Sequence, residues 1–92
     1  MKYFALIYDG AEGYAERRAP FREEHLRLVR EAHARGDISM AGAVGDPPAG
    51  AMFVFRSESP AAAEAFARQD PYVVNGVIAR WQVKPWNVVV GP

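Results

Sequence analysis

The pattern of hydrophobic and polar residues along the chain predicts four strands and two helices. Short runs that are apolar, alternating, or rich in β-branched and aromatic residues predict strands. These runs cover residues 2–8, 38–44, 51–56 and 77–85, and a further short edge strand is expected at 88–90. Apolar residues that recur every three or four positions predict helices over 20–36 and 61–69. The predicted order is therefore strand, helix, strand, strand, helix, strand.

Proline and glycine residues support these boundaries. Pro20 suits the first turn of the first helix, and Gly36 suits its end. Ser59 and Pro60 are typical of the start of the second helix. The glycines and prolines of residues 45–50 predict a hairpin turn between the second and third strands. This βαββαβ order indicates an α+β, ferredoxin-like fold, in which two helices cover one face of a four-stranded antiparallel sheet.

The first predicted strand is apolar on both of its faces. Phe4, Leu6 and Tyr8 lie on one face, and Tyr3, Ala5 and Ile7 lie on the other. A strand of this kind is normally covered on both sides. Because two helices cover only one face of the sheet, the other face would expose a large apolar patch. We therefore expect a homodimer in which two sheets pack face to face.

Composition excludes several classes of protein. The chain has 92 residues, of which 50% are hydrophobic and 24% charged, so we expect one folded domain over residues 1–92. Its 11 Lys and Arg residues balance its 11 Asp and Glu residues, so no overall field attracts nucleic acid or an acidic membrane surface. The absence of cysteine excludes disulfides and thiol chemistry and fits a reducing compartment. No segment has the length of a membrane helix or of a signal peptide's apolar region, so we expect a cytoplasmic protein.

His25 and Asp70 form the candidate catalytic pair. His25 lies in the apolar stripe near the start of the first helix, and Asp70 follows the inner face of the second. In a βαββαβ fold with right-handed crossovers, the start of the first helix and the end of the second meet at one edge of the sheet. A carboxylate bonded to one imidazole nitrogen fixes the tautomer and leaves the other nitrogen as a general base. Two simpler interpretations remain open: a core histidine bonded to the nearest acceptor, and an aspartate that only ends a helix before Pro71.

The candidate substrate-binding residues are Tyr72, Arg22, Arg18 and Ser39. The hydroxyl group of Tyr72 can donate to a developing oxyanion, although its ring can equally pack in the core. Arg22 lies one helical turn before the histidine, and with Arg18 it brings positive charge suited to an anionic substrate. The alternative for both arginines is a solvated position on the outer face of the helix. Ser39, on the second strand, can line the wall of the same pocket.

Other chemistries lack their motifs in this sequence. His25 and His33 are separated by about 12 Å of helical rise, too far to bind one metal ion together. We expect neither a metal site nor a cofactor. Residues 42–45 lack the glycine spacing and the following helix of a phosphate-binding loop, and no serine occupies a nucleophile elbow. Trp81 and Trp86 suit the core and an interface better than nucleic-acid stacking, so we expect no nucleic-acid partner.

Short motifs spread over almost the whole chain resemble those of a known family. They are Arg18, Arg22, His25-Leu26, Ala41-Gly42, Asp70-Pro71-Tyr72, Gly76-Val77 and Val83-Lys84-Pro85-Trp86. Together they resemble the YCII, or YciI-like, family. The resemblance implies a dimeric α+β barrel made of two ferredoxin-like subunits. It also implies an active site built on a histidine and an aspartate, which here are His25 and Asp70.

The resemblance further implies a class of reaction. The family is related to muconolactone isomerases, and one member is a dehydrochlorinase that acts on a chlorinated hydroxyhydroquinone. We therefore expect a cofactor-independent lyase or isomerase that moves a proton on a small cyclic substrate, either a hydroxylated aromatic or an unsaturated lactone. His25 would be the general base and Asp70 its orienting partner. Two alternatives remain: a non-catalytic dimeric module that binds a small metabolite or joins an assembly, and a cofactor-free oxygenase.

Overall fold

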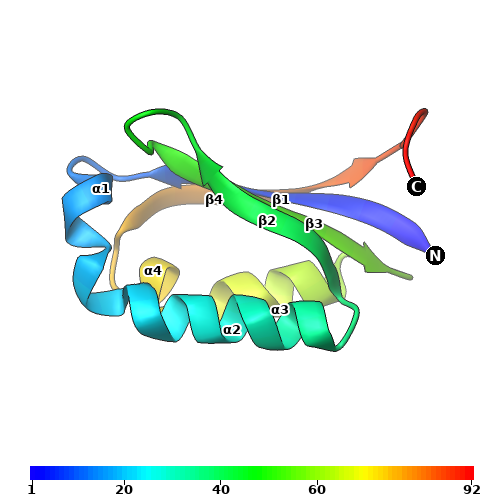
Figure 1. The fold of residues 1–92 in the computed structure, drawn as a ribbon, viewed down its shortest axis with the longest axis horizontal. Coiled ribbons are helices and arrows are strands. Elements are labelled where there is room, and N and C mark those ends of the chain that lie inside the picture. Colours follow the sequence, from blue (N-terminus) through cyan, green and yellow to red (C-terminus); the bar gives the residue numbers. More distant parts are fainter.

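The sheet is antiparallel and four-stranded, and it carries its helices on one face (Figure 1). The computed structural model describes all residues, 1–92. The strands are β1 (Lys2–Gly10), β2 (Ile38–Val44), β3 (Gly50–Ser57) and β4 (Ile78–Trp86). They lie side by side in the order β2-β3-β1-β4. This is the ferredoxin-like arrangement, so the predicted α+β fold is confirmed.

Two long helices cover the sheet, and three short helical segments connect them to it. The long helices are α2 (Arg22–Ala34) and α3 (Ala61–Gln69), and the short segments are α1 (Tyr14–Arg17), the 3-10 turn η1 (Ala19–Phe21) and α4 (Pro71–Val74). The first helix therefore begins two residues later than predicted, because Pro20 lies in the 3-10 turn. Gly36 follows the end of α2 with φ of 88°, as expected for a glycine that ends a helix. None of these helices is both long and apolar enough to cross a bilayer.

The expected strand at 88–90 does not form. Trp86, the last residue of β4, pairs with Tyr3, and β1 begins only one residue earlier, at Lys2. Residues beyond Trp86 therefore have almost no neighbouring strand left to pair with. Val89 and Val90 are more than 90% exposed as a result. The prediction of an edge strand at this position was wrong.

The core lies between the helices and the face of the sheet that they cover. Its buried members include Leu6, Tyr8, Phe53 and Phe55 from the sheet and Ala32, Ala63, Phe66 and Ala67 from the helices. Each large apolar side chain that is fully buried there contributes roughly 1.5–3 kcal/mol to stability. The apolar stripe predicted for the first helix is confirmed, because Leu28 and Val29 of α2 and Phe21 at the end of η1 pack against this core.

No helix covers the opposite face of the sheet (Figure 1). Side chains alternate between the faces of a strand, so this face carries the neighbours of the core residues. They include Tyr3, Ala5, Ile7, Met40, Val44, Met52 and Val54. Met40 is 67% exposed and Val44 is 53% exposed. A second copy packed on this face would cover them, and the homodimer stays a prediction.

Candidate functional site

Asp70 lies at a break between two helices, and the proline that follows it explains why. A residue before proline is disfavoured in the helical conformation. Asp70 is extended, with φ of −66° and ψ of 124°, so α3 ends before it and α4 begins at Pro71. The carboxylate then caps α4, where its Oδ1 accepts a hydrogen bond from the backbone N–H of Tyr72 at 3.0 Å. This local sequence therefore directs a carboxylate into the protein.

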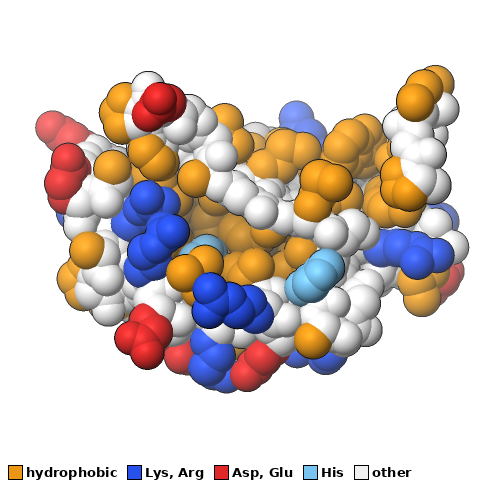
Figure 2. Space-filling view, viewed as in Figure 1, with side chains coloured by type: hydrophobic (Ala, Val, Ile, Leu, Met, Phe, Trp, Pro, Cys, Tyr) orange, Lys and Arg blue, Asp and Glu red, His pale blue; other side chains and the backbone are white.

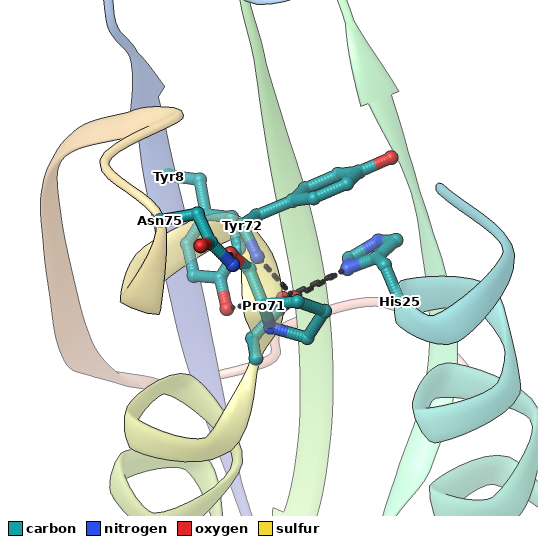
Figure 3. Close-up of polar contacts among 6 residues, drawn as sticks. Tyr8, His25, Pro71, Tyr72 and Asn75 are labelled. Atoms are coloured by element: carbon teal, nitrogen blue, oxygen red, sulfur yellow. Dashed lines mark hydrogen bonds and ion pairs between the residues drawn. The ribbon is translucent and has the colours of Figure 1, made fainter. Parts of the chain in front are cut away.

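The imidazole of His25 meets this carboxylate (Figure 3). Its Nδ1 lies 2.9 Å from Oδ1 and 2.8 Å from Oδ2 of Asp70. The hydroxyl group of Tyr8, from β1, donates to Oδ2 at 2.7 Å. His25 is 6% exposed and Asp70 is fully buried, so these partners replace the water that the charged group loses. The predicted contact between His25 and Asp70 is present, and its catalytic role stays a prediction.

This contact determines which nitrogen of His25 carries the proton. An ionised carboxylate can only accept hydrogen bonds, so Nδ1 of His25 is the donor. In the neutral ring Nε2 is then the unprotonated nitrogen. Nε2 forms no hydrogen bond within the chain, and it is not among the buried polar atoms that lack a partner. The geometry thus leaves a basic nitrogen open to the pocket described below.

Tyr72 lies directly over the imidazole. The two rings are stacked, with centroids 3.9 Å apart and planes 7° from parallel. Figure 3 shows the hydroxyl group of Tyr72 pointing out past the imidazole. This oxygen is buried and has no hydrogen-bond partner. Burial raises the pKa of Tyr72, and Tyr14 adds to the rise, whereas the charges of Arg18 and Arg22 and the closeness of the Arg22 guanidinium group to the hydroxyl oppose it. The phenol therefore remains a hydrogen-bond donor at neutral pH.

A pocket of about 130 Å³ opens beside these two rings. His25, Tyr72, Arg18 and Arg22 line it together with apolar residues of α1, α2, β2 and β3. The apolar lining consists of Tyr14, Leu26, Val29, Ala41, Gly42, Ala43, Ala51 and Phe53, counting the small glycine with them. Figure 2 shows the hollow with an orange floor, an edge of pale blue histidine and blue basic side chains at one side. A charged rim around an apolar floor is typical of a small-molecule site.

Ser39 is the one candidate substrate-binding residue that does not line this pocket. The pairing of β2 with β3 shifts between Ile38 and Met40, which makes Ser39 the extra residue of a bulge. Its side chain lies in a separate hollow with His33 and Met40. Nδ1 of His33 lies 2.8 Å from the carbonyl oxygen of Ile38.

No group of three potential ligands among His, Cys, Asp and Glu comes close enough to hold a metal ion.

Tyr8 is the site residue that the sequence did not reveal. We assigned it to the apolar face of a strand, where its ring does lie, 4.7 Å from the ring centroid of Phe53. The missed feature is its hydroxyl group, which bonds to Asp70. A buried tyrosine hydroxyl needs a partner, so a tyrosine on a core-facing strand position was a usable signal. Burial first, and then the charge of Asp70 and its hydrogen bond, raise the pKa of Tyr8 far above its ordinary value.

Known proteins match the chain over nearly its full length. The sequence model of the YCII-related domain matches residues 1–87. Protein YciI of Escherichia coli is 34% identical over 97% of this chain and 99% of its own length. An uncharacterized protein of Haemophilus influenzae is 30% identical over 95% of this chain and 98% of its own.

The chain shares its fold with a solved structure. It is 5-chloro-2-hydroxyhydroquinone dehydrochlorinase (TftG) from Burkholderia phenoliruptrix, in complex with 2,5-dihydroxybenzoquinone. It superposes with a TM-score of 0.77, at 20% identity, over 92% of this chain and 93% of that chain. At this level of identity the likeness shows the fold alone.

Proposed function

The chain belongs to the YCII-related family, and we propose that it is an enzyme that moves a proton on a small cyclic substrate without a cofactor. The substrate is a hydroxylated aromatic or an unsaturated lactone, and the reaction is an isomerisation or an elimination. The observation that carries this proposal is the His25–Asp70 pair, whose second imidazole nitrogen faces a pocket. A positioned base of this kind typically contributes 10²–10⁴-fold to a rate, as an order of magnitude.

His25 is the general base in this mechanism. Its Nε2 takes a proton from a substrate hydroxyl group or from a carbon next to a carbonyl, and the electron pair left behind forms an oxyanion. Asp70, which accepts from Nδ1, stabilises the imidazolium and keeps the ring in place. In an isomerisation the imidazolium returns its proton to another carbon. In an elimination the electron pair expels the leaving group, and the proton passes to solvent.

The oxyanion forms where the pocket offers hydrogen-bond donors and positive charge. The hydroxyl group of Tyr72 has no partner of its own, so it can donate to the oxyanion without giving up a bond. The guanidinium group of Arg22 lies on the same pocket. Donors that are already in place before charge develops lower the barrier without further reorganisation.

The size of the pocket and the solved relative both support a substrate with a single ring. A protein cavity of about 150 Å³ is known to hold benzene, and this pocket measures about 130 Å³. The solved relative is named a dehydrochlorinase, and its structure contains 2,5-dihydroxybenzoquinone. Transfer of a similar substrate class to this chain is part of the proposal.

Turnover of a panel of chlorinated hydroxyhydroquinones, hydroquinones and unsaturated lactones tests the proposal. His25→Ala should lower turnover by at least about 10²-fold while the fold is retained. His33→Ala is the matched control, since it removes the second histidine of the same helix outside the pocket. Equal turnover by wild type and His25→Ala would reject the mechanism. Saturable binding without any product would instead favour a metabolite-binding module.

A further inference from the structure

Two arginines at the pocket have no acidic partner. Arg27, Arg35 and Arg80 each form an ion pair with a carboxylate. Arg18 and Arg22 form none, and no Asp or Glu lies among the residues that line the pocket. Arg18 instead lies over the ring of Tyr14, 5.5 Å from its centroid. These two guanidinium groups therefore keep their hydrogen-bond donors available for a ligand.

A third unused donor lies next to them. Tyr72 is only 1% exposed, and its hydroxyl group is buried without a hydrogen-bond partner. Arg18, Arg22 and Tyr72 all line the same pocket, so a ligand there can reach all three. A buried hydroxyl without a hydrogen bond is unfavourable, and a ligand oxygen that accepts from it removes that cost.

The charges around the pocket favour a ligand that is already an anion. Arg18 and Arg22 contribute two positive charges and Asp70 one negative charge, so with His25 neutral the site carries one net positive charge. A phenol is neutral at pH 7, because phenols of the tyrosine type ionise near pH 10, whereas carboxylic acids ionise near pH 4. A carboxylate also matches the planar fork of a guanidinium group.

From this geometry we infer that the ligand of this pocket is a single-ring carboxylic acid, whose carboxylate is held by the guanidinium groups of Arg18 and Arg22. The inference rests on the proposed function and narrows it. The ring of the ligand lies on the apolar floor formed by Ala41, Ala51 and Phe53. Its reacting atom then faces Nε2 of His25. The fixed carboxylate and the oxyanion that develops during reaction are separate groups on the same substrate, so the single donor of the Tyr72 hydroxyl group stays available for the oxyanion.

Binding of matched acids and amides tests the inference without any turnover. The probes are benzoate, 4-hydroxybenzoate and 2-furoate, each compared with its own amide by NMR titration of the wild-type protein. Each amide keeps the ring and the planar shape but lacks the charge. At least one acid should bind about tenfold or more tightly than its amide, as expected for charge-assisted hydrogen bonds.

Variants show whether the preference comes from this site. Arg18→Gln and Arg22→Gln should each weaken the preferred acid by about tenfold and leave its amide unchanged. Arg27→Gln is the control, because Arg27 lies on the same helix but is paired with Glu24 and Glu31. It should leave the affinity for both probes unchanged.

Four results would overturn the inference. They are equal affinity for every acid and its amide, no loss in Arg18→Gln or Arg22→Gln, no binding of any acid at millimolar concentration, and displacement of the acid by equimolar phosphate or chloride. The last result would mean an adventitious ion only. Failure of the proposed function can be distinguished from failure of this inference. A protein that binds acids more tightly than amides but turns over no substrate contradicts the proposed function alone. Conversely, turnover of neutral phenols that is insensitive to Arg18→Gln contradicts this inference alone.

Discussion

Removal of the hydroxyl group of Tyr8 by the substitution Tyr8→Phe tests which contacts stabilise the candidate site. Tyr8 is 2% exposed, and its hydroxyl group donates to Oδ2 of Asp70 at 2.7 Å. Tyr8→Phe keeps the ring and its edge-on contact with Phe53 and removes only this donor. Asp70 retains its bonds to the backbone N–H of Tyr72 and to His25. The substitution therefore isolates one hydrogen bond to a buried charge.

The expected loss of stability follows from the kind of bond removed. Hydrogen bonds to charged groups contribute about 1.5–3 kcal/mol, so the free energy of unfolding should fall by about 2 kcal/mol. Tyr3→Phe is the matched control on the same strand, because the hydroxyl group of Tyr3 forms no hydrogen bond within the chain. Its effect should stay within about 0.5 kcal/mol. Urea unfolding at neutral pH measures both, and a Tyr8→Phe loss no larger than that of Tyr3→Phe would refute the reasoning.

Tyr8→Phe should also change how the free energy of unfolding depends on pH. Burial and the charge of Asp70 raise the pKa of Tyr8, so the folded state keeps the phenol proton after the unfolded chain has lost it. Below about pH 10 both states are protonated and the contribution of Tyr8 is fully present. Above that pH the free energy of unfolding should fall by up to about 1.4 kcal/mol per pH unit from this group. Tyr8→Phe lacks this pH-dependent contribution, so the difference in free energy of unfolding between wild type and Tyr8→Phe should shrink between about pH 9 and pH 11. A difference that stays constant over this range would contradict a buried neutral phenol.

Two further predictions concern the buried charge and the uncovered sheet face. Asp70→Asn removes the charge opposite His25 and should cost about 3 kcal/mol or more, whereas Asp9→Asn breaks an exposed pair with Arg80 and should cost less than about 1 kcal/mol. If urea unfolding showed equal losses in the free energy of unfolding for Asp70→Asn and Asp9→Asn, burial would not explain the cost of removing the charge. Ile7→Lys should convert the expected homodimer into a monomer in light scattering, while Val74→Lys, exposed on α4, should not. A monomeric wild type would remove the basis for a face-to-face dimer.

Much of the fold could be predicted because its main elements have strong local patterns. The aromatic and β-branched residues of β1 and the breakers of residues 45–50 marked strands and a hairpin correctly. The short helix α1 was missed, because four residues are too few to show a helical period. It depends instead on tertiary packing, in which the buried ring of Tyr14 meets that of Tyr72 with centroids 6.1 Å apart.

Only the part of the site that the order of strands and helices determines could be predicted from the sequence. The contact of His25 with Asp70 followed from the order of strands and helices, which sets which helix ends share an edge of the sheet. Ser39 was misplaced because a bulge shifts the phase of β2, and a bulge leaves little trace in sequence. Tyr8 was missed for a related reason. Its hydroxyl group reaches Asp70 across 62 positions of sequence, and only the packed structure fixes that distance.

The site and the expected dimer surface are linked through neighbouring residues of one strand. Tyr8 points into the core toward Asp70, and Ile7 points to the uncovered face of the sheet. A partner on that face would stabilise β1, and β1 fixes the position of Tyr8. Because Asp70 in turn orients His25, packing on one side of the sheet supports the geometry of the base on the other. Gly50 reinforces this dependence: a Cβ there would lie 2.2 Å from the carbonyl oxygen of Tyr8, so β3 holds that residue in close backbone contact.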